Sequence, residues 1–267
     1  MEKKQIYIKD RLVVYHTTGT GNVVLLIHGF GEKSDVWRNQ VPFLETNYRL
    51  IIPELPGSGD SSLQEDMSME GMAQTIREIL QIEKTETCTA IGHSMGGYIL
   101  LAFVEKFSSS LNGYGLFHST AFADTEEKKL NRRKGIEIIR EYGALPFLKN
   151  TTANLFSPLT QTERPQIIDE QIQTLTGFTG ESLISYYEAM IRRPDRTQLL
   201  RNSTLPVLFI AGKYDSAVPV SDSLRQCHLP SLSYIHILEN SGHMGMLEEE
   251  NKSNQILKNF LDKTTFT

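Results

Sequence analysis

Short apolar runs alternate with amphipathic stretches along most of the chain. Continuous apolar runs that are bounded by glycine or proline are typical of strands buried on both faces of a parallel sheet. Such runs predict strands at residues 22–28, 49–55, 85–91, 113–119 and 206–212, and an alternating segment predicts one more at 231–238. Two segments that alternate apolar and polar residues, 5–10 and 12–17, predict an antiparallel hairpin at one edge of the sheet.

Helical periodicity fills the intervals between these strands. Apolar residues three or four positions apart predict helices at residues 34–45, 69–82, 98–107, 221–228 and 246–261. Strands and helices that alternate in this way form a mostly parallel sheet with helices on both faces. We therefore predict the α/β class, with Trp37 in the core.

The segment 121–194 departs from this alternation. Charged helical periodicity covers residues 125–142, 165–175 and 181–193, interrupted by glycines and prolines, and no strand pattern appears between them. The α/β pattern then resumes. We predict a core domain made of residues 1–120 and 195–267, with a helical lid at 121–194 inserted between two of its strands. A separate helical domain is the alternative.

Composition and charge narrow the class of protein. The chain has 267 residues, a net charge of −5 and a pI near 5.8, so a nucleic acid or an anionic membrane would gain little by binding it. The longest purely apolar run, 98–104, is too short to cross a bilayer, and residues 1–10 do not resemble a signal peptide. We expect a cytoplasmic monomer or homodimer that binds a small molecule and neither nucleic acid nor membrane.

Neither a metal nor a cofactor is predicted. Cys88 and Cys227 form no disulfide framework and have no metal-ligand spacing, so we interpret both as packing residues. The glycines at 57 and 59 lack the further glycine repeat, or the Lys-Ser/Thr pair, of loops that bind nucleotide phosphates.

The sequence IGHSMGG at residues 91–97 lies between a predicted strand and a predicted helix. A sharp turn between the two would raise the hydroxyl of Ser94 above the sheet edge, as in a nucleophile elbow. Glycines on both sides of Ser94 leave room for that strained turn. Because this motif also arises by chance, a glycine-rich turn without chemistry is the alternative.

A serine nucleophile needs a base, and the base needs an acid that fixes its tautomer. Asp215 follows the predicted strand at 206–212 and His243 follows the one at 231–238, so both reach the sheet edge where Ser94 lies. We predict Ser94 as nucleophile, His243 as base and Asp215 as acid, in the chain order expected for such a sheet. Asp222 and Asp195 are the rivals for the acid.

The other histidines receive no chemical role from the sequence. We interpret His28 and His93 as loop-shaping residues, and the remaining four as packing or surface residues: His16, His118, His228 and His236. For the oxyanion of an acyl-transfer intermediate, two backbone N–H donors are expected, from Met95 at the helix start and from Phe30 in the loop after the strand at 22–28.

Six motifs together resemble the α/β-hydrolase superfamily: HGFG at 28–31, PGSGDS at 56–61, GHSMGG at 92–97, GKYD at 212–215, VP at 218–219 and SGH at 241–243. The resemblance spans nearly the whole chain. It implies an eight-stranded sheet, a lid, and the triad of Ser94, Asp215 and His243. Glu54 departs from the family, which commonly has Asp there. Dehalogenase and epoxide hydrolase relatives use an Asp nucleophile, which Ser94 argues against.

The chain is most similar to small bacterial esterases and to related C–C bond hydrolases and enol-lactonases. We predict a cofactor-free serine hydrolase that cleaves an ester-type bond of a small, largely apolar substrate through an acyl-enzyme. The alternatives are a C–C bond, lactone or thioester hydrolase with the same triad, and a ligand receptor or binding module on a hydrolase fold. The predicted pocket residues of the lid are Phe122, Phe147, Phe156, Tyr186 and Met190.

Overall fold

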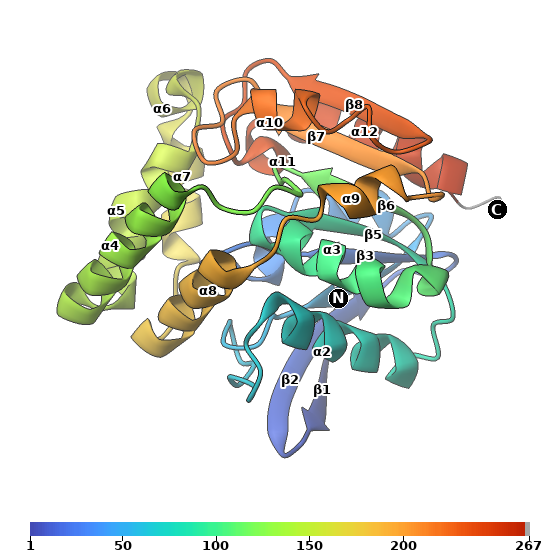
Figure 1. Ribbon diagram of the computed structural model, residues 1–267, viewed down its shortest axis with the longest axis horizontal. Coiled ribbons are helices and arrows are strands. Elements are labelled where there is room, and N and C mark those ends of the chain that lie inside the picture. The colour runs from blue at the N-terminus through green and yellow to red at the C-terminus, as the bar shows by residue number, and fades with distance from the viewer. Residues whose placement is uncertain (265–267) are drawn as a thin grey trace.

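One eight-stranded sheet organises the structure. The computed structural model describes residues 1–264 and gives the strand order β1-β2-β4-β3-β5-β6-β7-β8 (Figure 1). The pairs β1/β2 and β2/β4 are antiparallel and all other neighbouring pairs are parallel. The strands are β1 (Glu2–Ile8), β2 (Arg11–Thr18), β3 (Val23–Ile27), β4 (Arg49–Pro53), β5 (Cys88–His93), β6 (Leu111–Phe117), β7 (Val207–Gly212) and β8 (Ser233–Leu238). The predicted mostly parallel sheet with an edge hairpin is confirmed.

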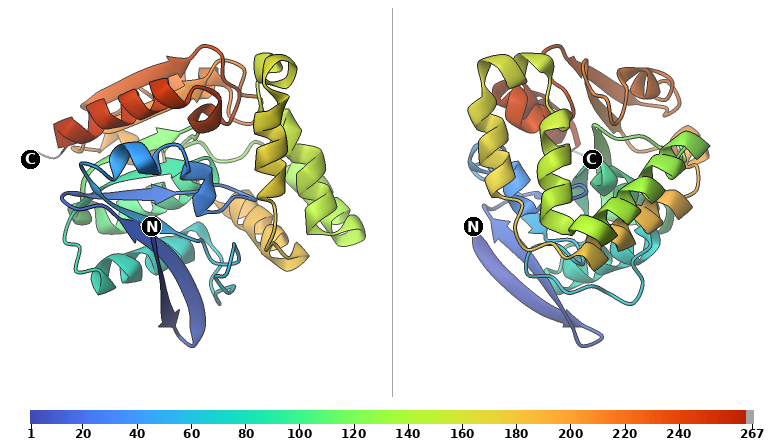
Figure 2. Two further views of the ribbon diagram at one scale, coloured as in Figure 1. Left: turned by 180° about the vertical axis from the view of Figure 1, so that it is seen from behind. Right: turned by 90° about the vertical axis from the view of Figure 1, so that its left-hand side faces the viewer.

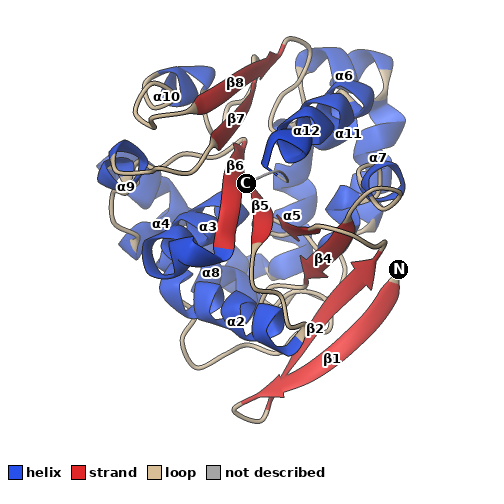
Figure 3. Cartoon of the chain, turned by 90° about the vertical axis from the view of Figure 1, so that its right-hand side faces the viewer, coloured by secondary structure: helices blue, strands red, loops and turns tan. Residues whose placement is uncertain are grey.

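The edge hairpin turns at Lys9 and Asp10, whose φ angles are 48° and 64°. Two consecutive residues with positive φ form a tight turn whose twist matches that of the flanking strands. The turn therefore lies one residue earlier than the predicted connection at 10–11. The hairpin forms one edge of the sheet (Figure 3).

Both faces of the sheet are buried, as the continuous apolar runs predict. In β3, Leu25 and Ile27 pack into one apolar core, whereas Val24 and Leu26 pack into a second one. This division follows from the alternation of side chains between the two faces of a strand.

Helices from different parts of the chain cover the two faces. One core contains α2 (Met69–Ile82) and α3 (Met95–Phe107). The other contains a 3₁₀ turn (Ser34–Trp37), α1 (Val41–Leu44), α11 (Gly245–Glu248) and α12 (Glu250–Thr264). Trp37 is fully buried there, as predicted. Within the described residues, every helix is too short or too polar to cross a membrane.

Six α-helices lie between β6 and β7, and no strand interrupts them in this described part of the chain. They are α4 (Glu126–Tyr142), α5 (Ala144–Thr152), α6 (Pro158–Glu163), α7 (Pro165–Gln173), α8 (Gly180–Arg192) and α9 (Thr197–Arg201). The first five gather on one side of the sheet (Figure 2). Side-chain caps define where α4 and α8 begin. At the start of α4, Thr125 accepts a hydrogen bond from the Lys128 N–H, and at the start of α8, Thr179 and Ser182 form a reciprocal capping box.

Several predicted boundaries need correction. Pro146 and Pro158 were expected to interrupt helices, but each lies in the first turn of one, α5 and α6, where proline is tolerated. The single helix predicted at 34–45 is a 3₁₀ turn followed by the four-residue α1. The helix predicted at 246–261 is divided between α11 and α12, and the one at 221–228 is limited to α10 (Val220–Leu224).

Candidate active site

Ser94 occupies the turn between β5 and α3. Its φ and ψ are 50° and −117°, a conformation that non-glycine residues rarely adopt and that needs support from the surrounding structure. That support includes a hydrogen bond from the Ser94 N–H to the Phe117 carbonyl, 2.9 Å. A Cβ on Gly92 would lie 2.5 Å from the Gly96 carbonyl oxygen, so the turn excludes any larger residue there. Strand, turn and helix have the geometry expected of a nucleophile elbow.

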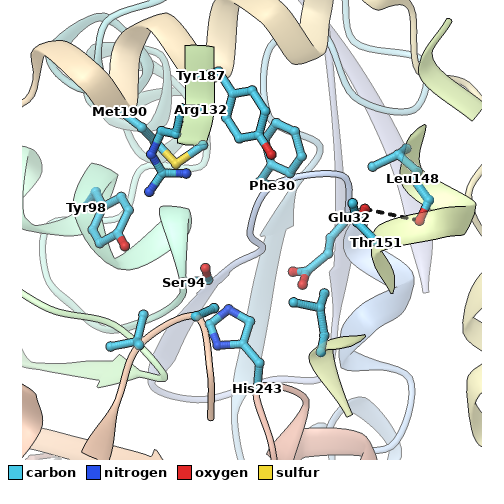
Figure 4. Close-up of a pocket in the computed structure, with 13 residues that line it drawn as sticks. Phe30, Glu32, Ser94, Tyr98, Arg132, Leu148, Thr151, Tyr187, Met190 and His243 are labelled. Atoms are coloured by element: carbon cyan, nitrogen blue, oxygen red, sulfur yellow. Dashed lines mark hydrogen bonds between the residues drawn. The ribbon is translucent and has the colours of Figure 1, made fainter. Parts of the chain in front are cut away.

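Asp215 and His243 meet at the same edge of the sheet. Asp215 follows β7, His243 follows β8, and His243 Nδ1 lies 2.8 Å from Asp215 Oδ2. The second oxygen, Oδ1, accepts the N–H groups of Ala217 (2.9 Å) and Val218 (2.8 Å). Ser94 and His243 both line one cavity of about 160 Å³ (Figure 4). The structure thus brings all three predicted residues together.

The electrostatics of the pair follow from burial and mutual attraction. Burial alone would raise the pKa of the Asp215 carboxyl, but the His243 charge and hydrogen bonds from two imidazoles hold this pKa well below its usual range. Burial also disfavours the charged form of His243, yet the charge and hydrogen bond of Asp215 outweigh it and raise the His243 pKa above its ordinary value. The carboxylate stays ionised while the imidazole can gain and lose a proton.

A second imidazole binds Asp215. His118 Nδ1 lies 3.0 Å from Asp215 Oδ2, and His118 Nε2 accepts the Gly245 N–H at 3.2 Å. The Gly212 N–H also lies 3.2 Å from His118 Nδ1. Because an ionised carboxylate can only accept, we assign the ring proton to Nδ1, which donates to Asp215. Burial lowers the pKa of His118 to about 4. The sequence predicts only a packing or surface role for His118; the available signal was that His118 directly follows β6, as Ser94 follows β5.

A buried acid and imidazole lie beneath the cavity. His93 Nδ1 is 2.8 Å from Glu32 Oε2, and His93 Nε2 is 3.0 Å from the His243 carbonyl oxygen. Both ring nitrogens therefore face oxygen atoms of the protein. Glu32 Oε2 also accepts the Gly29 N–H at 2.6 Å, and Glu32 lines the cavity. Sequence patterns gave no indication of Glu32, and they indicated only a loop-shaping role for His93.

The two predicted oxyanion donors lie where they were expected along the chain. Met95 is the first residue of α3, next to Ser94, and Phe30 lies in the loop after β3. Among the described residues, neither backbone N–H has a hydrogen-bond acceptor in the protein. Gly31, with a φ of 66°, lets the Phe30 loop turn beside the cavity. Both donors are thus available to a bound group.

His118, Asp215 and His243 also form the one cluster of potential metal ligands found among residues 1–264. Apart from Nε2 of His243, their ring nitrogens and carboxylate oxygens already form hydrogen bonds. The two oxygens of Asp215 accept four hydrogen bonds, and His118 Nε2 accepts a backbone N–H. The donor set therefore fits a hydrogen-bonded acid and base better than a metal centre.

A family model described as the alpha/beta hydrolase fold matches residues 22–250. The chain belongs to this family. Among curated relatives of this hydrolase, 3-oxoadipate enol-lactonase 2 of Acinetobacter baylyi is 25% identical over 96% of this chain and 95% of its own. Monoacylglycerol lipase ABHD6 of Bos taurus is 23% identical, covering 89% and 74%. A solved malate-bound esterase of Thermogutta terrifontis superposes with a TM-score of 0.92 at 27% identity, covering 99% of this chain and 100% of that one.

The cavity wall of the hydrolase is mostly apolar. Apart from Ser94, His243, Glu32, Arg132 and Thr151, it is lined by Phe30, Tyr98, Leu148, Leu155, Tyr187, Met190, Ala217 and Val218. Phe30 stacks on Tyr187, with ring centroids 4.4 Å apart and an interplanar angle of 8°. The residues thus form a fixed aromatic wall beside the nucleophile.

Of the five lid residues predicted to line the pocket, Met190 alone does so. Phe147 and Tyr186 pack behind Phe30 in the core beneath the lid, and the Tyr186 hydroxyl donates to the Pro56 carbonyl at 2.6 Å. Phe156 packs in the core on the opposite face of the sheet, and Phe122 lies under the Arg225 guanidinium, 4.6 Å from it. The prediction is corrected for these four because their rings pack against other parts of the protein and do not line the cavity.

Glu248, which is buried, joins the helical segment between β6 and β7 to the His243 loop. Its Oε1 accepts the N–H groups of Gly242 (2.8 Å) and Met244 (3.3 Å), on either side of His243. Its Oε2 accepts the Ser157 N–H (2.7 Å) and the Thr160 hydroxyl (2.8 Å) of the helical segment. One carboxylate therefore positions both segments, a role that no local pattern indicated.

Glu54, the departure from the family pattern, is accommodated by polar partners. Its carboxylate accepts the Ser34 hydroxyl at 2.5 Å and lies 3.3 Å from His16 Nε2. Burial would raise the pKa of Glu54, but these partners and the nearby His28 lower it to about 2. The loop after β4 is thus built around an ionised carboxylate.

Proposed function

We propose that this hydrolase cleaves an ester-type bond of a small, largely apolar substrate through an acyl-enzyme on Ser94. The observation that carries the proposal is the pair of Asp215 and His243, 2.8 Å apart, beside the cavity that Ser94 also lines. An esterase and a lipase among the relatives agree with this bond type.

The reaction would follow from the hydrogen bonds. Because His243 Nδ1 donates to Asp215, Nε2 of the neutral ring accepts the Ser94 proton as the oxygen attacks the carbonyl carbon. The N–H groups of Phe30 and Met95 would hold the resulting oxyanion. His243 then gives its proton to the leaving alcohol, and later activates the water that releases the acid.

The size and lining of the cavity support a small substrate. Its volume of about 160 Å³ is close to the ~150 Å³ of an engineered cavity that holds one benzene molecule. Most of its wall is apolar, which favours a substrate with an apolar body.

We also propose that residues 121–194 form a lid on a core made of 1–120 and 195–267, and that the lid sets selectivity. Three lid helices support this, because α4, α5 and α8 contribute Arg132, Leu148 and Met190 to the cavity wall. A lactone, which is a cyclic ester, is the second candidate for the bond that is cleaved. The enol-lactonase among the relatives supports this candidate.

The test is hydrolysis of short aryl esters, with lactones and thioesters in the same panel. Ser94→Ala should lower turnover by on the order of 10⁴-fold or more, and a phosphonate probe should label Ser94 in the wild type only. Ser109→Ala is the control. Ser109 is exposed and lies just after the end of α3, so this variant should retain turnover. If Ser94→Ala kept more than about a tenth of the activity, the elbow assignment would be wrong. If a ligand bound equally well to the wild type and to Ser94→Ala, and the wild type showed no turnover above background, the protein would be a ligand receptor and not an enzyme.

A further inference from the structure

Arg132 brings a positive charge to a cavity that is otherwise mostly apolar. Among the described residues that line the cavity, it is the single arginine or lysine. Its guanidinium reaches from α4 into the space above Ser94, on the side of Tyr98 and Met190 (Figure 4). The proposed chemistry at Ser94 does not require a cation at this place.

The charge of Arg132 is only partly neutralised by the protein. Asp124, whose side chain is fully buried, binds Arg132 Nε at 2.5 Å and Arg193 Nη1 at 2.8 Å. No other carboxylate within residues 1–264 forms an ion pair with either arginine. Two guanidinium groups thus share one carboxylate, which leaves one positive charge in excess. Glu32, on the other side of the cavity, has its own partner in His93.

The excess charge is directed at the cavity through Arg132. The Arg193 side chain is 3% exposed and donates to the carbonyl oxygens of Met190 and Phe122, whereas the Arg132 side chain is 19% exposed. Arg132 uses Nε and Nη2 on Asp124, and its Nη1 has no acceptor in the described part of the chain. Nη1 therefore offers N–H donors that a bound anion can accept without breaking the Asp124 ion pair.

Arg132 is also held in place before any ligand binds. Its guanidinium lies over the Tyr187 ring, 5.6 Å from the centroid, and Tyr187 itself stacks on Phe30. Such a fixed planar group binds a carboxylate with little loss of conformational freedom.

We propose that Arg132 binds a carboxylate of the substrate, so that the natural substrates are small esters with one free carboxylate beside an apolar body. The proposal rests on the proposed function and names its substrate class. The cavity volume of about 160 Å³ leaves room for a link of only a few carbon atoms between the ester and the carboxylate. The carboxylate belongs either to the acyl part or to the alcohol part.

Two pairs of esters of matched shape test the proposal, with an isopropyl group in place of the carboxylate. Monomethyl succinate and methyl 4-methylpentanoate test the acyl part, and acetoxyacetate and isobutyl acetate test the alcohol part. In at least one pair, kcat/KM for the anionic ester should exceed that for its neutral partner by about ten-fold or more, as expected for hydrogen bonds to a charged group. Arg132→Met should lower this ratio by about ten- to a hundred-fold.

Arg133→Met is the matched control, because it removes the same charge from an exposed position one residue further along α4; it should keep the ratio. Arg132→Met is expected to fold, since Asp124 retains Arg193 at 2.8 Å, and circular dichroism checks this. An unchanged ratio in Arg132→Met, or a preference for the neutral ester in both pairs, would overturn the proposal.

A binding measurement separates this inference from the proposed function. Calorimetry with Ser94→Ala, which needs no turnover, should show that the preferred anionic ester binds and that adding Arg132→Met weakens its Kd by about ten-fold or more. Equal Kd values would refute the role of Arg132 even if Ser94 proved catalytic. Conversely, charge-dependent binding together with full turnover in Ser94→Ala would refute the proposed function and leave the carboxylate site standing.

Discussion

His118 donates from Nδ1 to Oδ2 of Asp215 at 3.0 Å, the same oxygen that accepts from His243. Each oxygen of the Asp215 carboxylate therefore accepts two hydrogen bonds, because Oδ1 accepts two backbone N–H groups. A carboxylate held in this way has a single orientation, and it presents a fixed negative charge to His243. We interpret His118 as a positioning residue that acts through Asp215.

The burial of His118 predicts a pH-dependent stability, although its contact with Asp215 acts in the opposite direction. Burial holds the His118 pKa at about 4, below the ~6.5 of an unfolded histidine. Between these values the unfolded chain binds more protons, so stability should fall as the pH drops through this window, by on the order of 3 kcal/mol in all. His118→Phe should be less stable at pH 7 but should show a flatter dependence in urea unfolding from about pH 7 to pH 4. Equal slopes for both proteins would contradict the assignment; His228→Phe, at an exposed site, should keep the wild-type slope.

The raised pKa of His243 predicts the acid side of the pH–rate profile. The neutral ring is the form that accepts the Ser94 proton, so kcat/KM should decline as the pH falls through a value above the ~6.5 of an ordinary histidine. Asp215→Asn should lower the rate on the order of 10⁴-fold. The pH–rate profile of the remaining activity should move to lower pH, because the Asp215 charge that raises the His243 pKa is lost. Asp222→Asn is the control. Loss of activity in that variant, with Asp215→Asn active, would mean that the acid is misplaced.

Glu32 should influence the same profile from the other side of the cavity. Its charge helps to raise the His243 pKa, after the larger effects of burial and of Asp215. Glu32→Gln should therefore shift the acid limb of kcat/KM to lower pH. Glu86→Gln removes the same charge from an exposed position and should leave the limb in place. A limb that stays fixed in both variants would show that Glu32 has a structural role only.

The four hydrogen bonds of Glu248 predict a loss of stability on neutral substitution. In Glu248→Gln, the amide NH₂ must face donors that now lack an acceptor, which should lower the free energy of unfolding by about 2–3 kcal/mol. Limited proteolysis should cut the lid faster. Glu250→Gln, two residues later and exposed, is the matched control. Wild-type protease resistance in Glu248→Gln would contradict the link between lid and loop.

The position of Met190 in the cavity wall predicts an effect on selectivity. Met190→Ala should enlarge the cavity and move the preferred acyl chain toward longer esters, measured as kcat/KM across a series of aryl esters. Leu159→Ala, on the outer side of the lid, should not change the ranking, since Leu159 is 36% exposed and does not line the cavity. An identical ranking in both variants would mean that the lid does not set chain length.

The strands and the positions of Ser94, Asp215 and His243 were predictable because their signals are local. Buried parallel strands give continuous apolar runs, and loops after such strands must meet at one sheet edge. The helices α5 and α6 were missed because Pro146 and Pro158 suggested interruption, although proline is compatible with a first helical turn.

Contacts between residues far apart in the chain could not be predicted from local sequence patterns. Glu32 and His93 are 61 residues apart, and His118 and Asp215 are 97 apart, so their pairing depends on how the loops converge. The lid aromatics illustrate a second limit. Periodicity predicts which side chains are apolar, but it does not say whether a ring such as Phe147 faces the cavity or the core of the lid.

The bridge made by Glu248 has a consequence for recombining this scaffold with its relatives. A lid transplanted from another family member at the ends of 121–194 would arrive without the Ser157 N–H and Thr160 hydroxyl that complete the carboxylate's four hydrogen bonds, unless the donor sequence supplies equivalents. The unit of exchange is therefore not the contiguous insertion but two separate pieces of chain, the lid and residues 242–248. Chimeras that carry both pieces from one parent should retain a correctly placed imidazole, and those whose lid lacks equivalents of the Ser157 and Thr160 donors should lose it.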